Sequence, residues 1–242
     1  MDNRLIVSGC SFTDYCWSTW GDYLSPEFAE FENVGICGAD NATIARRVVD
    51  RARANDIVVI LWSGFDRWSQ YKNKPFPSLA DRDDNHWYHI GSVKADKAYL
   101  VNHYHCVERF QTTMDYIYLI ECDSRKKNYT AYHFSAFPFL LGEIEKTVDP
   151  KIQAIYSKYT ISNDYLHEIS LFDYQVQNNQ YHITNHQDNP SDTHPTPLTH
   201  WEYCSKIIAP KLNLTLSTNI DDVLKEQHNL IVKNLARKFI IK

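Results

Sequence analysis

Short apolar runs alternate with helical patterns along the first sixty residues. Residues 5–7, 31–34 and 57–61 are predicted strands, and the last is an unbroken run of five apolar residues, typical of a parallel strand buried on both faces. Between them, the spacing predicts a helix over about 12–24 and a second helix that begins at Asn41 as its N-cap. Strands that alternate with helices predict an open α/β sheet with right-handed crossovers.

The rest of the chain continues this pattern around two insertions. A polar, aromatic-rich insertion covers 68–96, and a long helix is expected over about 97–122. A strand at 130–134 follows, then an irregular stretch over 138–190 and a last core helix at about 198–208. We therefore expect one domain over 1–212 that carries both insertions.

The C-terminal segment 213–242 is predicted to be an appended amphipathic helix. Asn219 suits its N-cap, and apolar residues fall on one face at Val223, Leu224, Ile231, Leu235 and Phe239. Such a face either packs on its own chain or forms a homodimer contact, and the sequence leaves both readings open.

Composition narrows the class of protein. The chain has 242 residues, of which 43% are hydrophobic, and its net charge is −5. This charge argues against nucleic acid or anionic lipid as a partner. We find no run long enough to span a membrane and no signal peptide, so a cytoplasmic protein is expected. The six cysteines show no C-x-x-C pair or zinc-like spacing, and no metal or other cofactor is expected.

The first candidate for chemistry is the turn Gly9-Cys10-Ser11-Phe12-Thr13, which follows the first predicted strand. Ligands bind at the carboxyl edge of open α/β sheets, and this turn would place a serine hydroxyl there. Helix-start amides beside Ser11 could receive negative charge on a substrate oxygen. The plainer alternative is that Ser11 only caps a helix.

Two further blocks follow the second strand and precede the last core helix. In Asn33-Val34-Gly35-Ile36-Cys37-Gly38, the final glycine lets the backbone approach a ligand closely. In Asp192-Thr193-His194-Pro195, a histidine could take the proton of a serine hydroxyl, with the aspartate holding its tautomer.

In this order and placement, the three blocks resemble those of the SGNH (GDSL-like) hydrolase family, over roughly residues 4–210. The resemblance implies a flavodoxin-like three-layer α/β/α sandwich with a mainly parallel sheet. It also implies that Ser11 is the nucleophile, that Gly38 donates a backbone amide to the oxyanion hole, and that Asp192 and His194 complete the triad. His200, six residues beyond His194, matches the family's usual ending.

The chain departs from the family pattern at three places. Cys10 replaces an Asp that is not one of the reacting groups, and only one residue separates Asp192 from His194, which leaves Asp188 as an alternative partner. Phe65 falls near the position of the family's oxyanion-hole Asn. Ser63 or Asn41 could supply that donor instead.

The implied reaction is hydrolysis of an ester through an acyl-enzyme, with removal of a small acyl group such as O-acetyl from a glycan or a small molecule. Arg67 could bind a substrate carboxylate or phosphate. Aromatic residues of the first insertion could form a stacking wall, namely Trp68, Tyr71, Phe76, Trp87 and Tyr88.

Two other readings remain open. One is a non-catalytic binding or structural module that keeps the fold without the oxyanion-hole Asn. The other is a metal site formed by the late histidines, His182, His186, His194 and His200.

Overall fold

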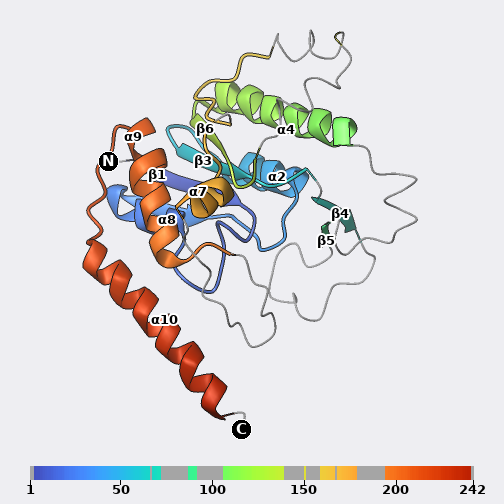
Figure 1. The fold of residues 1–242 in the computed structure, drawn as a ribbon. Helices are drawn as coiled ribbons and strands as arrows, with labels where there is room; N and C mark the ends of the chain where they lie inside the picture. The colour runs from blue at the N-terminus through green and yellow to red at the C-terminus, as the bar shows by residue number, and fades with distance from the viewer. Residues whose placement is uncertain are drawn as a thin grey trace, which may run out of the picture.

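The structure is a computed structural model, shown in Figure 1, and it describes residues 3–65, 67–71, 87–91, 106–138, 150, 159–166, 168–178 and 194–240. Several predictions fall outside these residues: the start of the long helix at 97–105, and the candidate residues His182, His186, Asp188 and Asp192. The predicted stacking wall also lies outside the description, which covers neither Phe76 nor the side chains of Trp68, Tyr71, Trp87 and Tyr88.

A four-stranded parallel sheet forms the centre of the domain. Its order is β2 (Glu30–Asn33), β1 (Arg4–Gly9), β3 (Ile57–Trp62) and β6 (Thr130–Ser135). The two central strands are buried almost throughout, as their unbroken apolar runs predict. The predicted α/β sheet is therefore confirmed.

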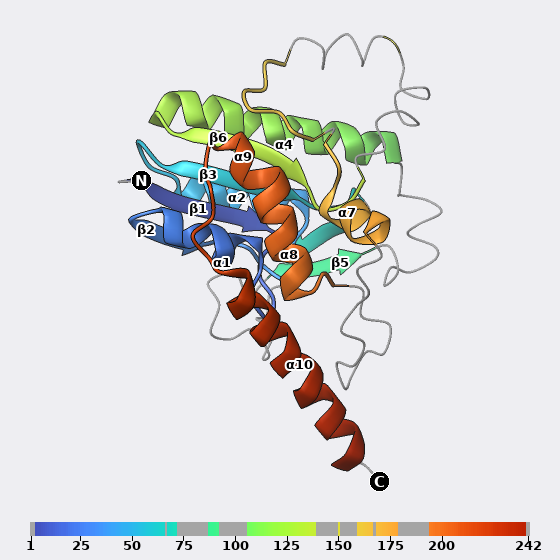
Figure 2. The ribbon, with the colours of Figure 1, turned by 60° about the vertical axis from the view of Figure 1, so that its left-hand side comes forward.

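Helices cover both faces of this sheet, which gives three layers (Figures 1 and 2). On one face, α2 (Asn41–Arg51) packs against α4 (Cys106–Lys127). On the other, α1 (Trp20–Leu24) packs against α8 (Pro197–Tyr203), and α7 (Leu171–Gln177) contacts α8. The arrangement is an α/β/α sandwich.

The remaining elements are short or peripheral. A 3-10 helix, η1 (Ser25–Glu27), follows α1, and a π-helical segment, η4 (Cys204–Ile208), leads from α8 into α9 (Ala209–Lys211). In the first insertion, β4 (Arg67–Tyr71) and β5 (Trp87–Gly91) pair antiparallel. The C-terminal helix α10 (Ile220–Ile240) extends away from the domain (Figures 1 and 2).

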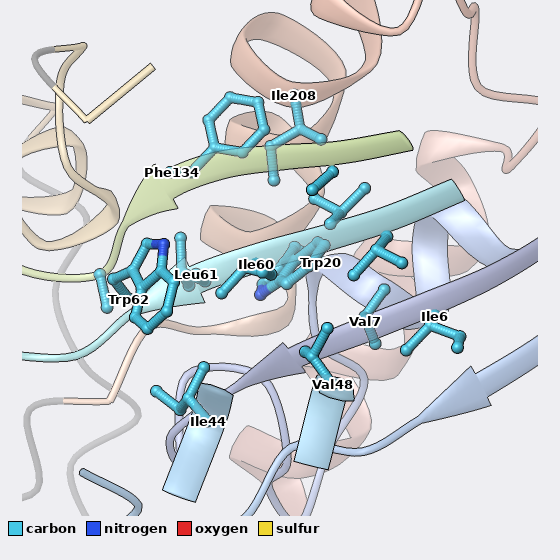
Figure 3. Close-up of a cluster of buried hydrophobic side chains, with 14 of the residues drawn as sticks. Ile6, Val7, Trp20, Ile44, Val48, Ile60, Leu61, Trp62, Phe134 and Ile208 are labelled. Carbon is cyan, nitrogen blue, oxygen red and sulfur yellow. The ribbon is translucent and has the colours of Figure 1, made fainter. Parts of the chain in front are cut away.

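The hydrophobic core lies on both sides of the sheet. Figure 3 shows side chains from α2, Ile44 and Val48, and from the opposite layer, Trp20 and Ile208, meeting the strand residues. All four are at most 1% exposed. Full burial of one such side chain contributes about 1.5–3 kcal/mol to folding, so the two faces together hold the layers on the sheet.

The two outer strands are protected differently. Beyond β6, the His133 amide donates to Asn163 O at 3.1 Å and the Tyr165 amide donates to His133 O at 2.9 Å, so an irregular segment pairs with this edge. Strand β2 has four residues and pairs only with β1 within the described part of the chain. Its Glu30 and Phe31 are exposed.

The predicted helix over 12–24 is wrong in its first half. The chain makes a single turn after Cys10 and becomes helical only at Trp20. At the new start, Thr19 N donates to Asp22 Oδ2 at 2.7 Å, as in a capping box, and the Asp22 amide donates to the backbone carbonyl of Thr19 at 3.1 Å. This local signal defines the helix start better than the apolar spacing does.

Other boundaries also shift. The N-cap of α2 is Asp40, whose Oδ1 accepts from Thr43 N at 2.9 Å, so Asn41 is the first helical residue and not the cap. The stretch 138–190, expected to be irregular, contains the helix α7. The long helix ends at Lys127 and not near 122.

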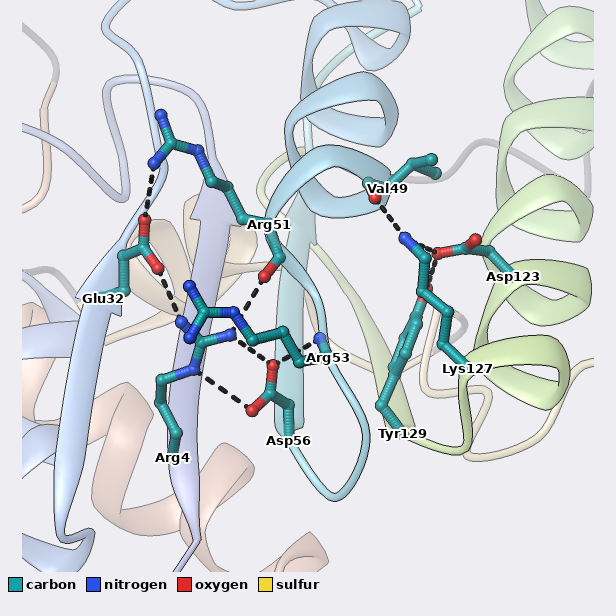
Figure 4. A network of polar contacts seen from close by, with 9 residues as sticks. All are labelled: Arg4, Glu32, Val49, Arg51, Arg53, Asp56, Asp123, Lys127 and Tyr129. Atoms are coloured by element: carbon teal, nitrogen blue, oxygen red, sulfur yellow. Dashed lines mark hydrogen bonds and ion pairs between the residues drawn. The ribbon is translucent and has the colours of Figure 1, made fainter.

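A polar network ties the amino ends of the strands together (Figure 4). The Arg4 guanidinium donates to Asp56 at 2.6 and 3.1 Å, to Glu32 at 3.0 Å and to the Arg51 carbonyl at 2.9 Å. Asp56 also accepts from Arg53 N at 2.7 Å. These contacts join β1, β2, β3 and the end of α2 at the edge of the sheet opposite to Ser11.

Candidate active site

The first predicted block forms a tight turn at the carboxyl end of β1. The Thr13 and Asp14 amides both donate to Cys10 O, at 2.8 and 3.1 Å. Gly9 is required at this point, because a Cβ atom would lie 2.1 Å from Thr13 Oγ1 and 2.9 Å from Leu61 O. The turn holds Ser11, which is 3% exposed, at the carboxyl edge of the sheet.

The second block is tied to the first. Asn33 Nδ2 donates to Thr13 O at 2.8 Å, and the Ile36 amide donates to Gly9 O at 3.1 Å. Gly38 then adopts a φ of 86°, in the left-handed region that favours glycine. The loop that carries Gly38 is therefore fixed against the turn that carries Ser11, while its role in an oxyanion hole stays a prediction.

Asn41 fastens the loop after β3. Its Oδ1 accepts from Ser63 N at 2.8 Å, and its Nδ2 donates to Ser63 O at 3.1 Å and to Thr113 Oγ1 at 3.0 Å. Both amide hydrogens of Asn41 already form hydrogen bonds, so the side chain would have to break one of them before it could donate to a substrate oxygen.

The Ser63 side chain is in the opposite situation. It is 1% exposed, and its Oγ has no hydrogen-bond partner among the described residues. Phe65, which falls near the expected Asn of the SGNH pattern, packs edge-on against Phe110 with ring centroids 5.7 Å apart. Of the two residues considered as substitute donors, Ser63 therefore has the hydroxyl that is available.

The third block brings His194 to the Ser11 turn. The imidazole stacks on Tyr15 with centroids 4.1 Å apart, and it meets the edge of Phe12 at 5.5 Å. Its segment is anchored where Trp17 Nε1 donates to Pro195 O at 2.9 Å. These contacts place the His194 imidazole against the turn that carries Ser11.

The sequence reasoning missed the residues that support this histidine. Phe12 and Tyr15 hold the imidazole between the β1 turn and the start of α8. Their spacing within one short aromatic segment, Phe12, Tyr15 and Trp17, was the available signal. That spacing did not identify the partner of these rings, because His194 lies far along the chain.

His200 lies deeper in the same region. It is 1% exposed, its Nδ1 has no hydrogen-bond partner within the described part of the chain, and burial lowers its pKa to about 3, with a smaller contribution from the nearby charge of His194. His200 is therefore neutral at neutral pH. Of these two histidines, His194 is the one that is partly exposed.

Arg67 reaches the same edge from β4. Its Cζ lies 5.4 Å from the ring centroid of Phe137, and that ring lies 4.8 Å from Phe12. Its Nη1 is buried without a hydrogen-bond partner among the residues described. The neighbouring Trp68 pairs with Ile90 across the β4–β5 hairpin. A cation thus lies along the aromatic row that leads to His194.

Two absences apply to the described residues only. They contain no group of three or more His, Cys, Asp or Glu residues arranged to hold a metal ion. None of their helices combines the length and the apolar character needed to cross a bilayer.

Comparisons with known proteins place the chain only loosely. No protein-family model matches the sequence, and no curated protein matches it with significance. Among solved structures, phospholipase A1 from Streptomyces albidoflavus NA297 aligns with a TM-score of 0.41 and 11% identity, over 88% of this chain and 99% of that one. The YxiM protein from Bacillus subtilis aligns with a TM-score of 0.32 and 13% identity, over 99% of this chain and 58% of that one. Similarities at this level carry no information about a reaction.

Proposed function

We propose that this protein is a serine ester hydrolase of the SGNH type. The observation that carries the proposal is the contact between the His194 imidazole and Phe12, the residue next to Ser11. Two segments from opposite ends of the domain, each carrying a residue suited to one half of nucleophilic catalysis, thus come into contact at the edge of the sheet where ligands of such folds bind.

In the proposed reaction, Ser11 Oγ attacks the ester carbonyl carbon while His194 accepts the hydroxyl proton. The tetrahedral intermediate collapses as His194 returns that proton to the leaving alcohol. Water then repeats the sequence on the acyl-enzyme: His194 takes its proton, the acid leaves, and Ser11 Oγ is reprotonated. Asp192 is proposed to hold the imidazole tautomer, with Asp188 as the alternative partner.

The oxyanion is proposed to rest on the backbone amide of Gly38 and the hydroxyl of Ser63. Supporting this choice, Ser63 Oγ is buried and without a partner among the described residues, whereas the Asn41 amide is already bonded. A donor that needs no reorganisation is worth most in a buried site. The proposed substrate is an ester with a small acyl group, such as acetyl, on a glycan or a small molecule.

The proposal is tested by hydrolysis of p-nitrophenyl acetate. We expect Ser11→Ala and His194→Ala to lower kcat by at least about 10³-fold, because each removes one half of the nucleophile–base pair. Ser217→Ala, at an exposed serine on the segment before α10, is the matched control and should keep full activity. Circular dichroism would verify that all variants are folded.

Full activity in folded Ser11→Ala would contradict the proposal. So would a wild type that hydrolyses no ester in a panel of acetyl to octanoyl esters and is not labelled by a fluorophosphonate. That second outcome would favour a binding module that kept the fold and lost the reaction.

Arg67 and Trp68 are proposed to bind the substrate, with Arg67 recognising an anionic group. A buried guanidinium nitrogen without a partner is stabilised by a carboxylate or phosphate that reaches it. We expect Arg67→Met to lower kcat/KM for p-nitrophenyl hemisuccinate by about tenfold or more, and to change that for the neutral acetate less than twofold. Equal losses on both esters would assign Arg67 to folding and not to recognition.

A further inference from the structure

The C-terminal helix α10 is attached to the domain by one side of its first turns. Val223 is 1% exposed, and the carboxylate of Glu226 accepts from the Ser18 amide at 3.0 Å. Gln227 Oε1 accepts from the Leu198 amide, also at 3.0 Å. These contacts fix where the helix begins and in which direction it leaves the domain (Figure 2).

A second side of α10 is apolar and faces solvent. Ile220, Leu224 and Ile231 are 40%, 44% and 40% exposed, and they fall within one stripe of the helix. In the sequence, Leu235 and Phe239 continue the same spacing. The stripe lies beside the face that holds Val223 and Gln227, so the attachment to the domain leaves it uncovered.

The charges of α10 are divided along its length. The first two turns carry acids at Asp221, Asp222 and Glu226, together with one lysine. The second half, from 231 to 240, carries three basic residues and no acid, namely Lys233, Arg237 and Lys238. Two such helices side by side attract each other when antiparallel and repel each other when parallel.

We propose that α10 is a dimerisation helix that pairs antiparallel with α10 of a second copy of this chain. A two-fold axis between positions 229 and 230 sets Leu224 level with Leu235 of the partner subunit, and Ile220 level with Phe239 of the partner subunit. The apolar stripe then meets itself, and each acidic half lies along a basic half. The contact is the same from both sides, as a two-fold dimer requires.

The length of the helix suits this role. Its 21 residues span about 30 Å, and the part beyond the first turns stands clear of the domain in both views (Figures 1 and 2). A second helix can therefore lie along the stripe without displacing the contacts of Glu226 and Gln227.

The mass in solution tests the proposal. Light scattering after size exclusion, with the full chain at about 50 μM, should give twice the chain mass of 28.3 kDa. The double variant Leu224→Glu and Ile231→Glu should give the monomer mass, because it buries charge in the apolar stripe. The matched control is Leu119→Glu, at a leucine of α4 that is 47% exposed, and it should remain a dimer.

Cross-linking tests the orientation, in a background where the exposed Cys16, Cys37 and Cys122 are replaced by Ser. Antiparallel pairing predicts a disulfide when the variants Leu224→Cys and Leu235→Cys are mixed, and little dimer from either variant alone. A parallel pair would give the reverse pattern and overturn the proposed orientation.

Two results would overturn the dimer itself. One is a monomeric wild type up to about 200 μM. The other is a monomer that binds phosphatidylserine-containing vesicles and loses this binding in the double variant, which would make α10 a helix that lies on membranes. In either case the ester hydrolase proposal would stand, because its residues lie outside α10.

Discussion

His194, just before α8, and His200, within α8, lie in contrasting surroundings. His194 is partly exposed and held by the Tyr15 ring, whereas His200 is fully buried and its Nδ1 has no partner among the described residues. Because burial lowers the pKa of His200 to about 3, its folded form resists protonation. The stability of the folded protein should therefore depend on pH within a range in which the carboxylates are still ionised.

The expected sign follows from proton binding. The unfolded chain binds a proton at His200 below about pH 6.5, but the folded chain does not until about pH 3. The free energy of unfolding should therefore fall as pH drops, by about 1.4 kcal/mol per unit between these values. Urea unfolding at pH 7.0, 6.0 and 5.0 measures this slope. His200→Gln should flatten it, and an unchanged slope in that variant would assign it to other groups.

Ser63 provides the sharpest test of the oxyanion hole. If its hydroxyl donates to the developing oxyanion, Ser63→Ala should lower kcat by about 10²-fold and leave KM within about twofold. Ser124→Ala, at another buried serine on α4, is the control for loss of a buried hydroxyl. A rise in the KM of Ser63→Ala with unchanged kcat would instead indicate a role in substrate binding.

At the scale of single residues, the sequence identified candidate residues for catalysis but not the contacts that hold them in place. Ser11 and His194 each stand in a short recognisable pattern, so each could be identified alone. The stacking of His194 on Tyr15 and the pairing of Asn41 with the Ser63 backbone depend on tertiary approach. No spacing along the chain reports such contacts.

Among the elements, strands were predicted better than helices. Buried parallel strands must be apolar on both faces, so β1 and β3 appear directly in the sequence. The helix expected from residue 12 failed because the turn after Cys10 and the capping box of Thr19 and Asp22 break the segment in two. Consequently, Ser11 lies on a single turn, and the first helix after β1 begins only at Trp20.

Asp56 is the main joint between elements at the amino edge of the sheet. Its carboxylate accepts from Arg4 and from the Arg53 amide, and its side chain is 6% exposed. We expect Asp56→Ala to lower the free energy of unfolding by about 3 kcal/mol, because it leaves a nearly buried guanidinium with fewer partners. Urea denaturation measures this loss.

Asp50→Ala is the control for that measurement, since the Asp50–Arg51 pair is exposed and should contribute less than about 1 kcal/mol. Ester hydrolysis per folded molecule should be the same in both variants, because this edge is opposite to the Ser11 turn. Reduced activity in fully folded Asp56→Ala would show that the two edges are coupled.

In the whole molecule, the amino ends and the carboxyl ends of the parallel strands have different roles. The charged network of Arg4 fastens the amino ends, and the candidate catalytic residues occupy loops at the carboxyl ends. Glycine and short turns dominate the second edge, where Gly9 and Gly38 allow close approach of the backbone. The sequence predicted this polarity because parallel strands bring all their carboxyl ends to one side.

The two outer strands of the sheet, β2 and β6, are protected unequally, and this difference affects how the protein behaves at high concentration. The segment at 163–165 already occupies the hydrogen-bonding groups beside β6, whereas β2 is protected by its brevity and by the exposed charge of Glu30. Glu30→Val would extend an apolar run through the exposed Phe31, and we expect static light scattering to show irreversible particles during concentration. The control variant Asp50→Val, which changes a residue on a helix surface, should form no such particles when it is concentrated. Colloidal stability would then depend on one carboxylate at the rim of a four-residue strand.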